Sequence, residues 1–246
     1  MKEVKVKKKK KLYEGETKIL YETDHEELLL LEFKDDVAGD AGKKGKIKGK
    51  GAVNNQVAAH LFKYLESYHV PTHFVGLHSD HAMVVRKLEM LPFVVVMHNV
   101  ATGGLVKRSG SKEGQTLEKP LLEFYRKEDK KYASQLEEKA ILEAGSVNDE
   151  ELVAIERMAL KINAVLKAFF QRRGLRLVNF RLEFGRNKAE KLVLADELSP
   201  DTCRLWDAET GEKYDPERLR KDAGKIEEAY EEVRRRVFSK PGAVAA

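Results

Sequence analysis

The sequence predicts an α+β fold, and three features of its apolar pattern support that prediction. Short apolar runs dominate the first hundred residues, with one amphipathic segment among them, which is typical of an antiparallel sheet with a single helix. Residues 148–173 follow with the period of a long helix, and two strand-like runs come directly after it. We expect a sheet-rich N-terminal half and a mixed C-terminal half, with a boundary near Leu91–Pro92.

The N-terminal half begins with a predicted hairpin. Residues 11–33 read as two strands around a turn at Thr23–His25. Residues 35–51 are rich in Gly, Lys and Asp and predict a long loop, which is usually functional or mobile in a compact domain. A helix is expected over 52–67, and Pro71 ends that element before three short strands within 72–100.

The C-terminal half is predicted to alternate helices and strands. Asn148 is a candidate N-cap with Glu151 three positions later, and Gly174 closes the helix that they open. Strands are expected at 175–186 and 191–199, joined by a polar turn at 187–190. The last helix is expected over 215–238, with Glu and Arg on its surface.

Composition narrows the class of protein. The longest apolar runs, Leu28–Leu31 and Phe93–Met97, are far shorter than the roughly 18 residues of a membrane-spanning helix. The lysine-rich start lacks the apolar segment of a secretory signal, and the lone Cys203 excludes an intramolecular disulfide and a Cys-based zinc site. We therefore expect a cytoplasmic protein without a membrane partner.

The net charge of +5 is concentrated at the N-terminus. Residues 1–11 contain seven lysines and one glutamate, so the rest of the chain carries a net charge of −1. A lysine run binds polyanions weakly, but no aromatic-interleaved or helix-turn-helix pattern accompanies it. The sequence predicts a solvated basic tail over residues 1–11 and no specific nucleic-acid partner.

Two carboxylates form the clearest candidate metal site. Glu183 and Asp196 lie on consecutive predicted strands, so antiparallel pairing would bring them side by side. Mg²⁺ takes one or two carboxylates and completes its octahedron with phosphates and water, which suits a metal–ATP site. The alternative is that both are solvent-facing strand residues.

Basic residues form candidate anion sites. The segment SPDTCRLWD places Ser199, Asp201 and Arg204 around a proline turn, and Arg218 and Arg220 follow on a later segment. Surface ion pairing is the alternative for these side chains. The lysine–glycine loop that ends at Gly51 precedes a helix and is a weaker candidate, because it lacks the P-loop spacing. Four histidines, at positions 69, 73, 78 and 81, show no recognised metal-ligand spacing.

Eight segments together resemble the SAICAR synthetase family, in order and with its spacing. The resemblance covers about residues 11–237, and LADELSPDTCRLWD is the most specific segment. The others are LYEGETKILY, KGKGAVNNQ, VRKLEMLP, NVATGGLVKR, LEFYRKED, NFRLEFGR and DPERLRKDAG…EAYEEV. The resemblance implies a kinase-like antiparallel sheet lobe packed on a second α+β domain. The domains would be a basic tail (1–11), an ATP-binding lobe (12–92) and a substrate and metal-binding domain (93–246).

The resemblance also implies an activity. An ATP-dependent ligase of this family joins the carboxylate of carboxyaminoimidazole ribotide to the amine of L-aspartate, through an acyl phosphate, in purine biosynthesis. The implied cofactors are ATP and Mg²⁺, the partners are these small molecules, and a homo-oligomer is possible.

The resemblance assigns the site residues by position. Lys18, Glu183 and Asp196 would be catalytic, with Mg²⁺ held by Glu183 and Asp196. The nucleotide would be bound by Lys18, Lys87, Glu89 and Met90 together with the two metal carboxylates. The ribotide and amino acid would meet Asp40, His98, Gly104, Arg181, Ser199, Arg204 and Arg220.

This chain departs from the family pattern mainly on the substrate side. The family usually has arginine at His98 and serine at Gly104, and its DFK segment is Asn179–Arg181 here. Further departures are Glu16, Glu128 and Ala133–Ser134. A histidine in place of arginine loses a permanent charge and a bidentate donor. The alternatives that stay open are a paralogue that ligates a different carboxylate or amine, and a nucleotide-binding protein without turnover. A kinase is disfavoured because no HRD catalytic loop or DFG motif is present.

Overall fold

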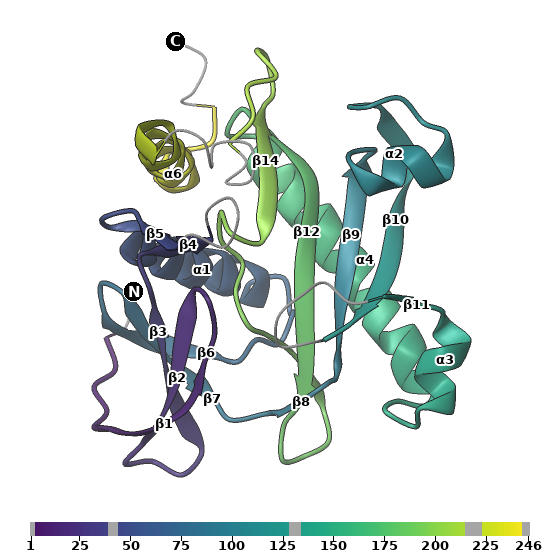
Figure 1. Ribbon diagram of the computed structural model, residues 1–246. Helices are drawn as coiled ribbons and strands as arrows, with labels where there is room; N and C mark the ends of the chain where they lie inside the picture. Colours follow the sequence, from purple (N-terminus) through teal and green to yellow (C-terminus); the bar gives the residue numbers. More distant parts are fainter. Residues whose placement is uncertain (1–2, 39–43, 128–133, 215–222, 243–246) are drawn as a thin grey trace.

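The computed structural model describes residues 3–38, 44–127, 134–214 and 223–242, and it shows two antiparallel sheets with helices packed on them (Figure 1). The five-stranded sheet has the order β1-β2-β3-β7-β6. The seven-stranded sheet has the order β11-β10-β9-β12-β13, with β14 and β8 also paired to β12. The α+β prediction is therefore confirmed.

The first sheet and its helix take up the chain as far as Arg86. Helix α1 packs against β3, β6 and β7, and its buried residues include Leu61 and Phe62. A small hairpin, β4–β5, precedes α1 where the long loop is predicted. The elements are β1 (Lys8–Glu14), β2 (Lys18–Thr23), β3 (Leu28–Phe33), β4 (Asp36–Ala38), β5 (Lys44–Lys46), α1 (Lys50–Glu66), β6 (Phe74–Ser79) and β7 (Ala82–Arg86).

The second sheet is built on the long central strand β12, with helix α4 packed against β12 and β9. Helix α6 returns to contact α1, so the end of the chain closes on the first unit (Figure 1). The elements are β8 (Glu89–Met90), β9 (Phe93–Val100), α2 (Gly104–Ser109), β10 (Thr116–Arg126), β11 (Gln135–Leu136), α3 (Glu138–Glu143), α4 (Asp149–Gln171), β12 (Leu175–Arg186), β13 (Leu192–Ala195), β14 (Cys203–Asp207) and α6 (Ala223–Phe238).

One hydrophobic core joins the two sheets. It runs from Leu31 and Phe62 on the first unit to Phe93 and Phe184 on the second, all nearly inaccessible to solvent. The chain passes from one sheet to the other between Arg86 and Glu89, a few residues before the predicted division near Leu91–Pro92, because β8 already pairs with β12. The division into separate domains stays a prediction.

Several local predictions are confirmed. The Asn148 side chain accepts a hydrogen bond from the Glu151 amide at 2.9 Å, as its N-cap position predicts, and α4 begins at the next residue. The strand predicted over 175–186 is β12, and it pairs antiparallel with β13 as expected, but β13 covers only Leu192–Ala195 of the predicted 191–199. Within the described ranges, no helix is long and apolar enough to span a membrane.

Two predictions for the N-terminus are wrong. The segment predicted as one strand over residues 11–23 is two, β1 and β2, separated by a turn at Gly15–Thr17. The predicted tail is also wrong in its conformation over the described residues 3–11, because Lys8 begins an edge strand paired with β2, although the residues of that strand are exposed as predicted. Val6 explains the difference: it is buried in a small cluster with Leu30 and Val84, which ties the segment down.

Candidate functional site

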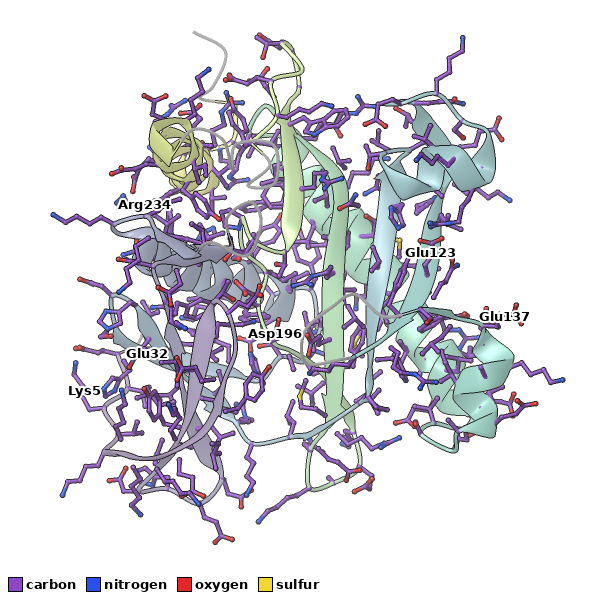
Figure 2. The ribbon with its side chains drawn as sticks, viewed as in Figure 1. Lys5, Glu32, Glu123, Glu137, Asp196 and Arg234 are labelled. Atoms are coloured by element: carbon purple, nitrogen blue, oxygen red, sulfur yellow. The ribbon has the colours of Figure 1, made fainter. Side chains whose placement is uncertain are left out.

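A cleft of about 570 Å³ lies between the two sheets and receives side chains from both. Asp196 points into this central region, between the N-terminal strands and β12 (Figure 2). The cleft has an apolar end, an acidic centre balanced by lysines, and a basic end. Each part is built from different elements.

The apolar end is made largely by strands of the first sheet and the start of the second. Leu20, Val85, Leu88, Met90 and Val94 line it. Aliphatic walls of this kind suit a flat, weakly polar ring. Met90 thus lines the cleft, and its contact with a nucleotide stays a prediction.

Two other predicted nucleotide residues lie outside this lining. The side chains of Lys87 and Glu89 are exposed, and neither residue belongs to the walls of the cleft. The Lys87 amide donates to the Glu27 carbonyl at 2.9 Å, which keeps that backbone in the sheet region. A role for either side chain in nucleotide binding stays a prediction.

The acidic centre contains the predicted metal pair. Glu183 on β12 lies opposite Ala195 on β13, so Asp196, the next residue, enters the cleft beside it. Asp196 has a φ of 61°, in the left-handed region that non-glycine residues rarely adopt. Such strained backbone is held by its surroundings and is common at functional sites. The local strand pairing that the sequence predicts is what brings the two carboxylates together.

Lysines neutralise both carboxylates. The Lys18 ammonium contacts Asp196 and also lies 2.9 Å from a Glu197 carboxylate oxygen, and Lys127 contacts Glu183. Lys18 comes from the first sheet and these carboxylates come from the second, so this ion pair bridges the cleft. Mg²⁺ needs only one or two protein carboxylates. Consistent with so small a donor set, no group of three or more His, Cys, Asp or Glu side chains within the described residues is arranged as metal ligands.

Burial and charge set opposite pKa shifts in this centre. Burial, followed by the negative charge of Asp196, raises the pKa of Glu183 above its usual value. Burial also opposes ionisation of Asp196, but the Lys18 charge outweighs it and keeps the pKa of Asp196 below its usual value. Burial alone would lower the pKa of Lys18, yet Asp196 and Glu197 more than compensate and raise it. Lys18 is therefore a fixed cation at the centre of the cleft.

The basic end is carried by neighbouring strands of the second sheet. Asn179 on β12 lies opposite Arg204 on β14, and Arg181 follows on the same face of β12. The Asn179 amide and the Arg204 guanidinium both donate to the Thr102 hydroxyl, at 3.3 and 3.2 Å. Two guanidinium groups next to polar side chains suit a phosphate or carboxylate.

Three more predicted substrate residues are described, and none lines the cleft. Ser199 is buried beneath it, where its hydroxyl donates to Glu197 and accepts from the Asp201 amide at 3.1 Å. Gly104 begins the short helix α2. His98 is buried on β9. Their roles in substrate binding stay predictions, and Asp40 and Arg220 lie outside the described residues, as do Arg218, Glu128 and Ala133.

His98 is held by a buried carboxylate. Its Nε2 lies 3.0 Å from Glu123 Oε2, and Glu123 also accepts from Tyr125 at 2.7 Å and from Arg108 at 2.7 Å. Burial would raise the pKa of Glu123, but these donors outweigh it and lower the pKa to about 2. The charge of Glu123 is therefore permanent at neutral pH, and the His98 ring is turned toward it.

Sequence reasoning missed several residues of the cleft. Lys50 lies at the start of α1, 2% exposed, with its ammonium 2.5 Å from Asp201. Tyr230 on α6 reaches the same carboxylate, and Glu197 and Lys127 complete the central ion pairs. Only the lysine–glycine loop gave a signal for Lys50, as an anion site. Neither Tyr230 nor Glu197 stands out from the apolar and charged patterns around it.

Comparisons with known proteins agree on one family. A model of the family described as SAICAR synthetase matches residues 11–237. A protein of Chloroherpeton thalassium named phosphoribosylaminoimidazole-succinocarboxamide synthase is 47% identical over 234 residues, which cover 95% of this chain and 99% of that protein. A protein of the same name from Desulfitobacterium hafniense is 48% identical over 227 residues, or 92% of this chain and 95% of its own.

Solved structures agree as well. The crystal structure of phosphoribosylaminoimidazole-succinocarboxamide synthase from Ehrlichia chaffeensis has a TM-score of 0.88 at 36% identity, covering 94% of this chain and all of that one. A SAICAR synthetase in complex with ADP has a TM-score of 0.87 at 40% identity, and the match covers 93% of this chain and 98% of that one. Both the fold and the order of the segments are thus shared along nearly the whole chain.

Proposed function

The chain belongs to the SAICAR synthetase family, and from that premise we propose that it joins the carboxylate of carboxyaminoimidazole ribotide to the amine of L-aspartate at the expense of ATP. It is then a phosphoribosylaminoimidazole-succinocarboxamide synthase of purine biosynthesis, acting in the cytoplasm on small molecules. The observation that carries the proposal is the order of the cleft: an apolar end, a lysine–carboxylate centre and a guanidinium end between two sheets. The apolar end suits the adenine of ATP, the lysine–carboxylate centre suits the ATP phosphates with their cation, and the guanidinium end suits the anionic ribotide.

The reaction needs activation because a carboxylate is a poor electrophile whose leaving group would be oxide. Transfer of the γ-phosphoryl group to a carboxylate oxygen gives an acyl phosphate and ADP. The aspartate amine then attacks the acyl carbon, the carbon–oxygen bond breaks, and inorganic phosphate leaves as the amide forms. Little covalent chemistry falls to the protein, whose contribution is positioning and charge stabilisation.

The nucleotide fits the first two parts of the cleft. A relative at 40% identity binds ADP, which supports nucleotide binding by this chain. The adenine would lie between Leu20, Val85 and Met90, which brings the phosphates to Lys18. Lys18 is a permanent cation in the centre of the cleft, so it can meet the charge of the transferred phosphoryl group.

Magnesium fits the donors at this point. Glu183 and Asp196 supply two half-buried carboxylates side by side, with side chains 14% and 19% exposed, which is the oxygen donor set that Mg²⁺ takes beside nucleotide phosphates. When bound there, the ion would neutralise phosphate charge. Lys18 and Lys127 neutralise the same two carboxylates in its absence and would turn to the phosphates instead. Homo-oligomerisation is compatible with this site.

The ribotide would occupy the basic end. Arg181 and Arg204 present guanidinium groups from adjacent strands, and Thr102 and Asn179 add neutral hydrogen-bonding groups. A ribotide phosphate bound there would direct its imidazole carboxylate toward the centre of the cleft. Arg220 is proposed to add to the same pocket from the segment before α6.

The test is an assay of ADP release with omissions. ATP, Mg²⁺, the ribotide and aspartate are supplied together, and each is left out in turn. The proposal predicts amide product only in the complete mixture. ADP release should require ATP, Mg²⁺ and the ribotide, and it can occur without amide product when aspartate alone is missing. Tight nucleotide binding with no turnover in the complete mixture would favour the non-catalytic alternative.

One observation favours a second candidate, a ligase of the same chemistry with a different acid or amine. His98 stands where the family usually has arginine, and it turns to Glu123 instead of lining the cleft. The variant His98→Arg/Gly104→Ser/Asn179→Asp/Arg181→Lys rebuilds the family pattern. A gain of turnover on ribotide and aspartate in that variant, from a wild type without it, would support the second candidate.

A further inference from the structure

Asp201 is held by three donors from two helices that lie far from it in the sequence. The Lys50 ammonium lies 2.5 Å from Oδ2, the Asn54 amide donates to the same oxygen at 2.8 Å, and the Tyr230 hydroxyl donates to Oδ1. Lys50 and Asn54 belong to the first turns of α1, and Tyr230 belongs to α6. The Lys50–Asp201–Tyr230 cluster therefore ties together three segments at the wall of the cleft.

The cluster is buried and still borders the cleft. Lys50 is 2% exposed and the Asp201 side chain 12% exposed, yet both residues and Tyr230 line the cavity. An ammonium and a carboxylate removed from water are stable only when each stays paired and hydrogen-bonded. The donors thus fix the position of the Asp201 carboxylate closely, because any displacement leaves a buried charge without a partner.

The turn that contains Asp201 is hydrogen-bonded to the basic end of the cleft, so a fixed Asp201 also fixes that end. The Asp201 amide donates to the Ser199 hydroxyl at 3.1 Å, and the carbonyl of the next residue, Thr202, accepts from the Arg181 amide at 3.1 Å. Two residues further on, Arg204 lines the cleft on β14. The turn at 199–203 thus joins Asp201 to the residues proposed to bind the ribotide.

We propose that Lys50, Asp201 and Tyr230 are positioning residues that hold the ribotide wall of the cleft in its binding geometry. The inference rests on the proposed function, since it assigns the basic end to the ribotide. These residues act through the turn and through the placement of Arg204, and they leave the apolar nucleotide end untouched. Losing one contact of the cluster should therefore weaken ribotide binding more than ATP binding.

The chain provides a matched control for this inference. Helix α6 carries a second buried ion pair, in which Arg236 donates to Asp207 at 2.6 Å and to the Tyr214 hydroxyl at 3.1 Å. Neither Asp207 nor Tyr214 lines the cleft. Tyr214→Phe and Asp207→Asn therefore make the same substitutions as Tyr230→Phe and Asp201→Asn, but in a buried cluster that stabilises the fold away from the cleft.

The experiment measures kcat and the KM for ATP and for ribotide in the intact chain and the four variants, with thermal unfolding alongside. Tyr230→Phe should raise the KM for ribotide about tenfold, because a displaced Arg204 would lose about one charged hydrogen bond to the ribotide, with the KM for ATP changed by less than about twofold. Asp201→Asn should have the larger effect in the same direction. Tyr214→Phe and Asp207→Asn should lower the unfolding temperature without changing either KM.

Three results would overturn the inference. One is an unchanged ribotide KM in Tyr230→Phe beside a normal wild type. Another is an equal rise in both KM values, and the third is the same KM change in Tyr214→Phe. If the wild type itself gives no turnover, the proposed function fails separately, and calorimetric titration with the ribotide replaces the kinetics. Equal ribotide affinities of Tyr230→Phe and Tyr214→Phe, or no ribotide binding to the wild type, would then overturn the inference as well.

Discussion

Asp196→Asn separates a role in metal and phosphate binding from a role in folding. Asparagine keeps the shape of the side chain and tolerates the left-handed backbone at φ 61°, so the variant changes mainly the charge. Removing one partner of a buried ion pair usually costs about 3–5 kcal/mol, because the other charge is left uncompensated. The charge of Lys18 stays compensated in this variant, because a Glu197 carboxylate oxygen lies 2.9 Å from its ammonium.

A second effect stabilises the variant. The negative charge of Asp196 raises the pKa of Glu183, so removing it relieves a repulsion between two buried carboxylates. With loss and gain opposed, the free energy of unfolding should change by less than about 1 kcal/mol, or about 2–4 °C in Tm for a chain of this size. Turnover should fall at least about 100-fold, because about 3 kcal/mol of charge stabilisation around the phosphates is lost.

The assay pairs steady-state ADP release with calorimetric titration of ADP in the presence and absence of Mg²⁺. The Mg²⁺ dependence of ADP binding should disappear in Asp196→Asn. Glu190→Gln, which removes an exposed carboxylate from the turn between the same two strands, should behave like the wild type. Full activity of Asp196→Asn would refute the assignment, and a large fall in Tm would refute the charge argument.

Three further predictions follow from the same structure. Arg204→Ala should weaken binding of the ribotide at least about tenfold more than binding of its dephosphorylated nucleoside, which calorimetry checks, because the guanidinium is proposed to contact the phosphate. The pKa of Glu123 is about 2 in the folded protein against an ordinary 4.5, so this carboxylate stabilises the fold by about 3 kcal/mol above pH 4.5 and loses that contribution as the pH falls toward 2. Urea unfolding should show no such loss in Glu123→Gln, whereas Glu118→Gln on the same strand should keep it. Burial raises the pKa of Cys203 to about 12, so a thiol reagent should label it at pH 8 only after unfolding, and rapid labelling of the folded protein would contradict this.

Features that depend on interactions between residues close in the sequence were predictable from the sequence. Helix α4 follows from its apolar period and the Asn148 cap, both of which act within a few residues. The approach of Glu183 and Asp196 follows from a short turn between two strands, which leaves little freedom in their register. Such predictions succeed because the interactions that decide them are local.

Features decided by distant contacts were not predictable in the same way. Lys50 and Asp201 are 151 positions apart, and no periodicity marks a lysine for burial. The lysine-rich edge strand, whose residues are exposed, was mistaken for a tail because its anchor, the packing of Val6 on Leu30 and Val84, forms only once the sheet is assembled. In both cases the tertiary partner overrides the local preference of the residue.

Lys18 and Lys127 also change the electrostatics of the acidic pair Glu183 and Asp196. The sequence suggests an open pair of carboxylates at Glu183 and Asp196 that waits for a cation, but Lys18 and Lys127 already neutralise it. Two buried carboxylates without these lysines would repel each other and raise their own pKa values, which would weaken them as metal ligands. Under the proposed function, a nucleotide would bring phosphates for the lysines and a cation for the carboxylates, so each charged group would exchange one partner for another. Lys18 therefore keeps the pKa of Asp196 below its usual value, and a chain without Lys18 should have a less ionised Asp196 as well as a weaker phosphate site.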